Sequence, residues 1–246
     1  MFERLELLVG KEALNKIHNT SVLVIGLGGV GGYVTESLIR SGIENITIVD
    51  YDTIDESNIN RQIIALQNNI GKLKTDEFEK RILNINKNVK VEKKNLFIDE
   101  NNIDSLFNED IDYVIDACDT INTKKLIIDR CIKNNIKFIT CMGTGKRINP
   151  SKLVIGDLKD TSYDPIARIL RKYVKESGIK QKVICCYSKE EPLKYDGKAI
   201  ASNSFVPSSA GLLITSYVIR DICGLKEAQY NKYLFIKLYL VAFFSL

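Results

Sequence analysis

The sequence has no tryptophan, a single histidine, two methionines and four prolines among its 246 residues. A lone histidine excludes a multi-histidine metal site and leaves His18 as the sole imidazole for acid–base catalysis. His18 precedes the first predicted strand, so we expect it to be structural. None of the six cysteines forms a C-x-x-C pair, which excludes the usual thiolate zinc site, and we expect no structural zinc. We expect most of the cysteines to be small buried side chains.

The sequence also has no apolar run long enough to cross a bilayer as a helix. Its most apolar stretch, 233–246, would extend about 21 Å as a helix, against a hydrocarbon core of about 30 Å, and Lys237 interrupts it. This tail is expected to pack on a partner subunit or to lie at a membrane surface, and the residues leave both open. The first residues are charged and lack a signal-peptide core, so a cytoplasmic location is expected. A net charge of +4 is compatible with nucleic-acid binding without arguing for it.

A glycine-rich segment directly after a short apolar run is the strongest signal that the sequence does contain. The β-branched run 21–25 predicts a buried strand, and Gly26, Gly28, Gly29 and Gly31 follow it. Glycines let the backbone approach a phosphate closely, and the N–H groups of the next helix then point at the negative charge. The segment therefore predicts a nucleotide site.

Carboxylates follow two later predicted strands. Asp50 ends the run 46–50, at about the distance from Gly26 at which a Rossmann acid hydrogen-bonds a ribose. Asp52 follows closely, where a turn-forming role is nearly as well supported. Asp119 closes the run 113–120, where it either caps the next helix or holds Mg²⁺, which prefers a few oxygen ligands beside phosphates.

Amides and cations come soon after the predicted ribose acid. Asn58, Asn60 and Arg61 form one cluster, and Lys74 opens an amphipathic helix. Each could be an ordinary surface residue by itself. Together with a glycine loop, the two cations suit a polyphosphate better than a dinucleotide, because a triphosphate needs side-chain charge beyond that of helix-terminal N–H groups.

Alternating strand and helix patterns predict an α/β fold, with a doubly wound, mostly parallel, Rossmann-like sheet and helices on both faces. In such a sheet the residues after strand ends converge on one edge, which would bring Gly28, Asp50 and Asp119 together. In the second half, a helix starting at Asp164-Pro165 has a basic face that continues to Lys182. That face is either an ordinary solvated surface or a track for RNA phosphates.

Five motifs in order make the chain resemble the ThiF/MoeB adenylating family, relatives of the ubiquitin-activating enzymes. These are Gly26-x-Gly-Gly-x-Gly, Asp50-x-Asp52, Asn58-x-Asn60-Arg61-Gln62, Gly71-x-x-Lys74 and Asp116-x-x-Asp119. We therefore expect one ThiF-type domain over 1–224, with an ATP-binding core in 1–145, a substrate-side extension in 146–224 and the apolar tail 225–246.

The resemblance implies roles for individual residues. The glycine loop would cradle the phosphates, Asp50 would bind the ribose, Arg61 and Lys74 would clamp the phosphates, and Asp119 would bind Mg²⁺. Arg4 resembles the arginine that dimers of this family insert into the neighbour's ATP site, which implies a homodimer. Many members have asparagine after the metal aspartate, where this chain has Thr120.

Motifs downstream of 141 resemble the tRNA threonylcarbamoyladenosine dehydratases within this family, and they include Met142-Gly-Thr-Gly145, Asp164-Pro165 and Ser204-Phe-Val-Pro. This resemblance implies ATP-dependent cyclisation of threonylcarbamoyladenosine in tRNA through an acyl-adenylate, with a sulfur-relay protein as a further candidate partner. The alternative is an activator of a ubiquitin-like sulfur carrier, but the paired zinc motifs typical of bacterial activators are missing. A dehydrogenase would leave Arg61, Lys74 and Asp119 unused, and a degenerate nucleotide-binding scaffold would not need them.

Overall fold

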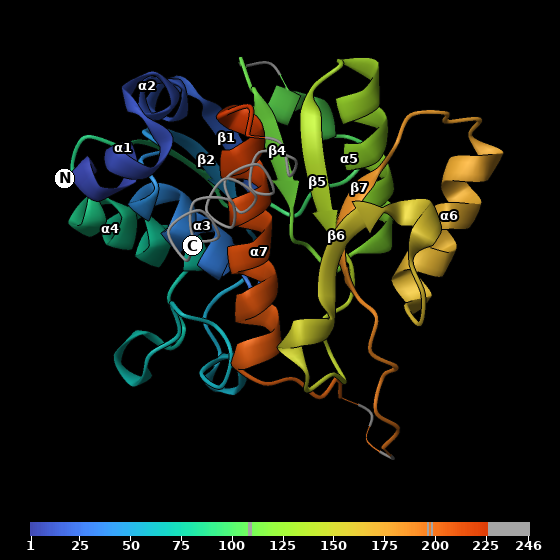
Figure 1. Cartoon of the computed structure of the whole chain (residues 1–246). Coiled ribbons are helices and arrows are strands. Elements are labelled where there is room, and N and C mark those ends of the chain that lie inside the picture. Colours follow the sequence, from blue (N-terminus) through green and yellow to red (C-terminus); the bar gives the residue numbers. More distant parts are fainter. Residues whose placement is uncertain (108–109, 196, 198, 226–246) are drawn as a thin grey trace, which may run out of the picture.

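Seven strands form one continuous sheet in the computed structural model, which describes residues 1–107, 110–195, 197 and 199–225. The order across the sheet is β3-β2-β1-β4-β5-β7-β6 (Figure 1). The strands are β1 (Ser21–Ile25), β2 (Asn45–Val49), β3 (Lys90–Lys94), β4 (Tyr113–Asp116), β5 (Lys137–Cys141), β6 (Leu153–Asp157) and β7 (Ile184–Ser188). The predicted tail 233–246 lies outside the described residues.

The sheet is parallel except at one edge, as the sequence predicts. β6 pairs antiparallel with β7, while the other neighbouring pairs are parallel. β1 lies between β2 and β4, so the chain leaves β1 first to one side and later to the other. Ligands of open α/β sheets bind outside the carboxyl ends of the strands at such a reversal point. The glycine loop therefore leaves the sheet at the place where a site is expected.

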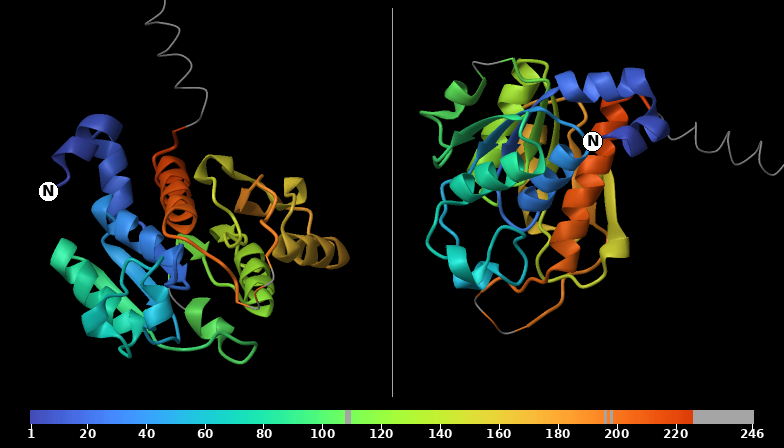
Figure 2. Two further views of the ribbon diagram at one scale, coloured as in Figure 1. Left: turned by 90° about the horizontal axis from the view of Figure 1, so that it is seen from below. Right: turned by 90° about the vertical axis from the view of Figure 1, so that its left-hand side faces the viewer.

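Helices cover both faces of the sheet (Figures 1 and 2). α3 and α7 pack against each other on one face, together with α2 and α4, while α5 and α6 pack together on the other. The helices are α1 (Glu3–Val9), α2 (Lys11–Asn19), α3 (Gly31–Arg40), α4 (Lys74–Ile85), α5 (Ile121–Lys133), α6 (Pro165–Glu176) and α7 (Phe205–Ile222). The predicted doubly wound fold is confirmed.

Apolar clusters on the two faces hold these layers. The α3/α7 face contains the largest cluster, with residues such as Val34, Leu38 and Ile214 fully buried. The opposite face is filled by one cluster beneath α5 and a second between α5, α6 and β7, which includes Leu170. His18 is structural as expected, because its Nδ1 lies 2.7 Å from the carbonyl oxygen of Gly42.

Three local features follow from the backbone. The segment before β1 forms two helices, α1 and α2, and Gly10 with φ +86° turns the chain between them. Residues Ile103–Phe107 form a short 3₁₀ helix before β4. In the second half, α7 begins at Phe205, and Pro207 lies in its first turn, where the fixed φ of proline suits a helix.

Candidate active site

A cavity of about 380 Å³ opens at the carboxyl ends of β1, β2, β4 and β5. Its walls come from the glycine loop and the segments after these strands, and also from 58–62, 96–98 and 200–207. Figure 2 (left) looks onto this end of the sheet. The volume lies within the range of cavities that bind nucleotide-sized molecules.

Glycine is required at both ends of the glycine loop. Gly26 has φ +89°, and a Cβ there would lie 2.8 Å from the backbone nitrogen of Cys118. A Cβ on Gly31 would lie 1.7 Å from the carbonyl oxygen of Gly26. Gly26, Gly28 and Gly29 line the cavity, whereas Gly31 forms the first turn of α3 behind it. The loop is thus tightly folded, with its backbone facing the cavity.

Asp50 holds this loop against the end of β2. Its Oδ2 accepts a hydrogen bond from the backbone N–H of Leu27 at 2.6 Å, and its Oδ1 accepts one from Asp52 N–H at 2.8 Å. Asp50 is buried and lines the cavity. A carboxylate has more acceptor sites than these two bonds use, so the position remains compatible with a ribose contact.

Lys74 brings a buried positive charge to the same wall. Its side chain is 5% exposed and its Nζ lies 2.8 Å from Oδ2 of Asp52. Asp52 itself is half-exposed, so the pair faces the cavity rather than the core. An ammonium group in this setting can exchange its carboxylate partner for a phosphate oxygen without breaking the fold.

Arg61 folds back onto the segment that carries it. Its Nη1 donates to the Ser57 carbonyl oxygen at 2.6 Å and to Oδ1 of Asn60 at 2.9 Å. Arg61 lines the cavity but Asn60 does not. The amide of Asn60 instead donates to the Ser202 carbonyl oxygen at 3.1 Å. Asn60 therefore joins the Arg61 segment to the opposite wall.

Asn58 lies in the cavity wall near Arg61. It is buried, and its Oδ1 accepts a hydrogen bond from the backbone N–H of Asp55. The side chain of Asp55 in turn accepts one from Ser57 N–H, so Asp55 has a turn-forming role. This reciprocal cap fixes the turn that presents Arg61.

Asp119 lines the cavity just beyond β4 and is exposed to solvent. It does not cap α5, which begins after Thr120 without a side-chain cap. The pKa of the nearby Tyr51 hydroxyl is raised by the charge of Asp52 and by burial, with further contributions from Asp119 and Asp50. Negative charge is therefore concentrated at this end of the cavity, where a cation would be bound favourably.

Arg4 lies on α1 and is exposed, outside the walls of this chain's cavity. Among the described residues, no group of three His, Cys, Asp or Glu side chains could hold a metal ion. Cys118 and Cys141 both reach the cavity. Burial and the nearby Asp116 carboxylate raise the pKa of the Cys118 thiol well above its ordinary value, which makes Cys118 a poor nucleophile.

One buried network beneath the cavity went unpredicted. Lys124 is fully buried, and its Nζ lies 3.0 Å from Oδ2 of Asp116 and donates to the Cys141 carbonyl oxygen at 2.7 Å. Thr140 Oγ1 bonds to the same Asp116 oxygen at 2.6 Å. Burial opposes charge on Lys124, but Asp116 outweighs it and the pKa of Lys124 is raised. The network ties the ends of β4 and β5 to α5; the Asp116 motif was the only sequence signal for it.

The loop 142–145, one of the motifs behind the family resemblance, forms a further wall of the cavity. Arg147 Nη1 donates to the carbonyl oxygens of Gly143 and Gly145 at 2.7 and 3.0 Å. Its Nη2 lies 3.5 Å from Oδ2 of Asp164, and both side chains are almost fully buried. Through Arg147, this ion pair links the loop 142–145 to the start of α6 and holds the loop in the cavity wall.

Gln62 and an aromatic pair complete the walls. Gln62 is buried, and its Oε1 has no hydrogen-bond partner in the part of the chain that the structure describes. Its amide lies against the glycine loop, near Gly28. Tyr51 and Phe97 meet edge to face with ring centroids 5.0 Å apart, and both are about half-exposed at the rim. Exposed aromatic faces of this kind can stack on a purine.

Chemically, the site combines backbone N–H groups, two side-chain cations and a cluster of carboxylates around one cavity. The part of the chain that follows β5 forms the second wall of the cavity, which consists of the loop 142–145, Ile166 and the segment 200–207. Such an arrangement can hold a polyphosphate and leave room beside it for a second reactant.

A search of the described residues for a membrane-spanning helix found none with the necessary length and hydropathy.

Comparison with known proteins identifies the family. The ThiF family model matches residues 2–245. The tRNA threonylcarbamoyladenosine dehydratase of Bacillus subtilis is 37% identical, over 94% of this chain and 97% of its own length. The Escherichia coli tRNA N6-threonylcarbamoyladenosine dehydratase, solved in complex with ATP, superposes with a TM-score of 0.86 and 31% identity, covering 91% of this chain and 93% of that one.

A sulfur-transfer relative matches a smaller part of the chain. An adenylyltransferase and sulfurtransferase from Vanderwaltozyma polyspora is 37% identical over 55% of this chain and 31% of its own length. The B. subtilis and E. coli dehydratases, by contrast, match more than nine-tenths of the chain. The chain therefore belongs to the ThiF family, on the branch that contains the tRNA threonylcarbamoyladenosine dehydratases.

Proposed function

We propose that this protein uses ATP to cyclise N6-threonylcarbamoyladenosine in tRNA. The observation that carries the proposal is the composition of the cavity, where the glycine loop, Arg61, Lys74 and Asp119 meet at the carboxyl ends of the strands. The dehydratase relatives match the chain over nearly its whole length, and the E. coli relative was solved with ATP.

The first step makes the substrate carboxylate reactive. A carboxylate oxygen attacks the α-phosphorus of ATP, the bond to the β-phosphate oxygen breaks, and pyrophosphate leaves with the electron pair. Backbone N–H groups of the glycine loop hold the phosphates. Lys74 and Arg61 balance the charge that develops on the phosphate oxygens, because both side chains already reach the cavity.

The second step closes the ring. The carbamoyl nitrogen of the same nucleoside attacks the acyl carbon, the C–O bond to AMP breaks and the nitrogen loses its proton. The overall change is loss of one water from the nucleoside. Intramolecular reactions of this kind can reach effective molarities of about 10⁵ M or more, so no enzyme nucleophile is required. The high pKa of the Cys118 thiol agrees with that conclusion.

Asp119 is the residue that we propose to hold Mg²⁺. Its exposed carboxylate in the cavity wall fits an ion that uses one or two protein carboxylates and completes its coordination with phosphate oxygens and water. When bound, Mg²⁺ would neutralise charge on the phosphates. Asp50 and Asp52 are engaged by backbone N–H and Lys74, respectively, which leaves Asp119 as the carboxylate available for this role.

We also propose a cytoplasmic homodimer that acts on tRNA, in which Arg4 of one subunit reaches the cavity of the other. Its exposed position on α1 is compatible with this role. The sulfur-relay partner stays a prediction. The membrane contact of the apolar tail also stays a prediction, because the tail lies outside the described residues.

The proposal is tested by incubating the protein with ATP, Mg²⁺ and tRNA that carries threonylcarbamoyladenosine, followed by mass analysis of the nucleosides. We expect the nucleoside to lose one water, with one AMP formed per cyclised residue. An unchanged nucleoside, with pyrophosphate released when a sulfur-carrier protein is added, would support the alternative activator function instead.

The Asp119→Ala variant tests the metal assignment. We expect AMP formation to fall to background at all Mg²⁺ concentrations while the melting temperature stays that of the parent protein, because Asp119 is exposed and makes no contact on which the fold depends. The matched control is Asp160→Ala, which removes an exposed carboxylate shortly after β6, outside the cavity walls. Turnover by Asp119→Ala near the parent rate would contradict the assignment.

A further inference from the structure

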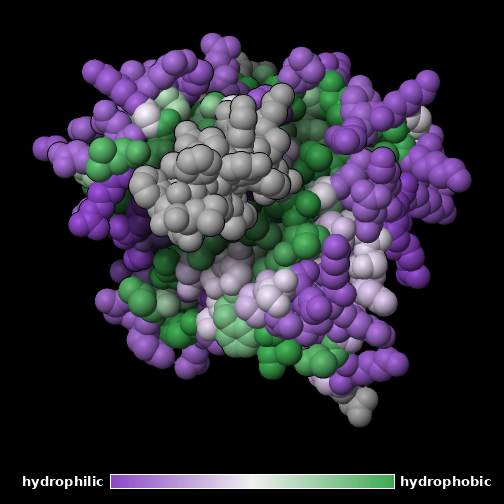
Figure 3. Space-filling model, viewed as in Figure 1, coloured by the Kyte–Doolittle hydropathy of each residue, from purple (hydrophilic) through white to green (hydrophobic). Residues whose placement is uncertain are grey.

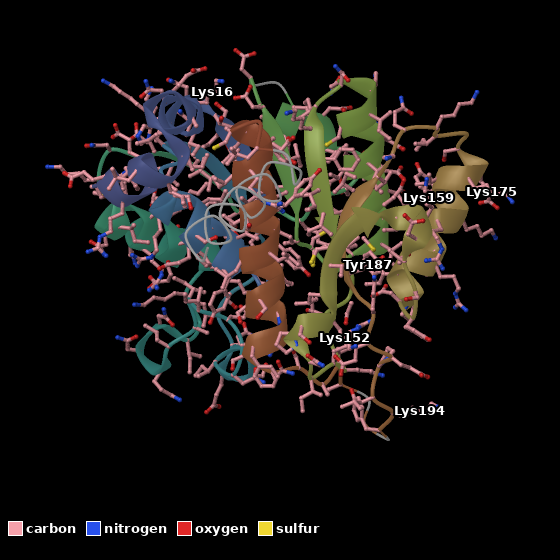
Figure 4. The ribbon with its side chains drawn as sticks, viewed as in Figure 1. Lys16, Lys152, Lys159, Lys175, Tyr187 and Lys194 are labelled. Carbon is pink, nitrogen blue, oxygen red and sulfur yellow. The ribbon has the colours of Figure 1, made fainter. Side chains whose placement is uncertain are left out.

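The surface of α6 carries a stripe of cations that the site described above does not use. Arg168, Lys172 and Lys175 are spaced by four and three residues, so they lie on one face of the helix, and all three are exposed. Figure 4 shows Lys175 pointing away from the body of the protein, and the α6 side of Figure 3 is predominantly hydrophilic. Lys180 and Lys182, which follow α6, are exposed too.

Little negative charge offsets this stripe. Glu176 is the one acid within α6, and its carboxylate lies 3.7 Å from Lys172 Nζ, with both side chains largely in water. Exposed pairs of this kind are weak and exchange readily. Among the described residues, Arg168 and Lys175 are in no ion pair. The stripe therefore presents cations that an anionic partner could bind directly.

The stripe begins at the cavity. Ile166, in the first turn of α6, lines the cavity wall. Asp164 caps the helix by accepting from Ala167 N–H, and it also pairs with Arg147, which holds the loop 142–145. From Ile166 to Lys175 the helix rises about 14 Å. The cations thus lead away from the reaction site along one line.

An exposed aromatic side chain directly precedes the N-cap of α6. Tyr163 is 57% exposed and has φ +54°, a left-handed conformation that is unusual for a bulky residue. Its carbonyl oxygen accepts a hydrogen bond from Arg147 Nη2, and Nη1 of the same guanidinium holds Gly143. The backbone is therefore held in a strained form that leaves the ring in solvent beside the cavity wall.

We propose that Tyr163 and the cationic stripe of α6 form the tRNA-binding face. Arg168, Lys172 and Lys175 contact successive phosphates of the strand that carries the modified adenosine, and Tyr163 stacks on an unpaired base next to it. The inference rests on the proposed function. Single-stranded RNA is recognised in this way, by cations along the backbone and aromatic faces for the bases.

The packing of α6 favours RNA over a membrane surface. A helix that lies on a bilayer must bury its apolar face in the lipid. The apolar face of α6 is already used, because Ala167 and Leu170 are fully buried in the cluster that α6 shares with α5 and β7. Ile166 and Val174 pack against the same cluster. What remains outside is the charged face together with Ile169, which is 38% exposed.

The stripe is tested by the triple variant Arg168→Glu, Lys172→Glu, Lys175→Glu. The matched control is Lys11→Glu, Lys87→Glu, Lys90→Glu, in which three exposed lysines distant from α6 in the fold are reversed to give the same net charge. Each phosphate contact contributes about 0.7 to 0.9 to the slope of log binding constant against log salt. We expect the slope for tRNA to become shallower by about 2 in the stripe variant and the KM for tRNA to rise at least about 10-fold at low salt.

Tyr163 is tested separately, because stacking and phosphate binding differ in their salt dependence. Tyr163→Ala is expected to raise the KM for tRNA about 5- to 100-fold with an unchanged salt slope, while Tyr163→Phe retains the parent value. A structural role of the ring would instead lower the melting temperature and affect ATP binding equally.

The measurements are the KM values for tRNA and ATP, tRNA binding at several salt concentrations and the melting temperature, all on the full chain. The inference is overturned by a stripe variant that binds tRNA like the parent protein, by a control that loses as much, or by loss of binding to anionic vesicles with tRNA binding intact. A parent protein that does not cyclise the nucleoside refutes the proposed function itself. Normal cyclisation by both parent and stripe variant, at equal KM, refutes the inference alone.

Discussion

At the scale of single residues, Lys74 is the side chain whose position most directly suggests a catalytic role. Its ammonium group is held at the cavity wall by Asp52, with its stem buried. We expect Lys74→Met to lower kcat/KM for AMP formation by about 10²- to 10³-fold, the usual effect of removing one donor that stabilises transition-state charge. The carboxylate left behind is half-exposed, so the fold should survive.

The measurement for Lys74 is AMP formation together with thermal unfolding. Lys72→Met, two residues earlier at an exposed position outside the cavity walls, is the control and should retain parent activity. Parent-like activity of Lys74→Met would show that the ammonium group serves the fold of the 52–74 segment rather than the reaction.

Alanine variants of Gly31 and Gly71 distinguish two reasons for glycine. Gly31 leaves no room for a Cβ in the glycine loop, whereas Gly71 has the room but a left-handed backbone conformation. A Cβ on Gly31 would meet the Gly26 carbonyl oxygen at 1.7 Å, whereas Gly71, with φ +84°, has nothing within 4 Å of that position. Gly71→Ala should lower the free energy of unfolding by about 1–2 kcal/mol, the cost of a left-handed conformation. Gly31→Ala should cost more than about 3 kcal/mol and weaken ATP binding, because backbone must move.

Urea unfolding and ATP titration of the two alanine variants check this expectation. Equal losses of stability in both, with ATP binding retained in each, would mean that the loop can relax around a methyl group.

At the scale of elements, Glu36 ties α3 to α4. It is nearly buried, and its carboxylate bonds to Arg81 of α4 at 2.6 Å and to Arg40 of its own helix at 2.7 Å. Burial raises the pKa of Glu36, but the two guanidinium groups outweigh burial and hold it below the usual 4.5. The pair therefore stabilises the fold above about pH 4.5, and the contribution disappears as pH falls through the lowered pKa of the folded state.

Glu36→Gln is accordingly expected to destabilise the protein at pH 7, by about 1.5–3 kcal/mol, and to have a smaller effect at pH 3, which lies below the unfolded-state pKa. Urea unfolding at the two pH values measures the difference. Glu12→Gln, which breaks the fully exposed pair with Lys16, should leave stability unchanged at both. A deficit of Glu36→Gln that is the same at pH 3 and pH 7 would point to packing rather than charge.

At the scale of the whole molecule, the question is whether one chain holds a complete site. Arg4 is exposed on α1, a helix without buried residues, and it does not line the cavity of its own chain. In the homodimer that we propose, Arg4 of each subunit reaches the other subunit's cavity, and two-fold symmetry makes the two sites equivalent. We expect Arg4→Ala and Lys74→Met each to have strongly reduced activity alone, and a mixture to regain activity, because mixed dimers contain one site with both residues.

Activity of the mixture after subunit exchange, compared with either variant alone at the same total concentration, checks this prediction. Arg4→Ala mixed with itself after the same treatment is the control. Full activity of Arg4→Ala alone would remove Arg4 from the site, while an inactive mixture would place its function within one chain.

Local sequence determined much of this protein. Short apolar runs and the helical spacing of apolar residues indicated the succession of strands and helices, because each segment carries its own pattern of buried residues. The convergence of Gly28, Asp50 and Asp119 also followed from sequence, since parallel strands put their carboxyl ends at one edge. The motif spacing then distinguished a polyphosphate site from a dinucleotide site.

Tertiary structure alone decided the rest. The Lys124–Asp116 network, the Arg147–Asp164 pair behind the second wall and the bond from Asn60 to Ser202 join residues 8, 17 and 142 positions apart. Whether these contacts form depends on which strands and helices become neighbours in the fold. The spacing of apolar residues within one segment carries no information on that. The order β5-β7-β6 brings the second half of the chain against the first, and with it the wall that makes an open sheet edge into a cavity.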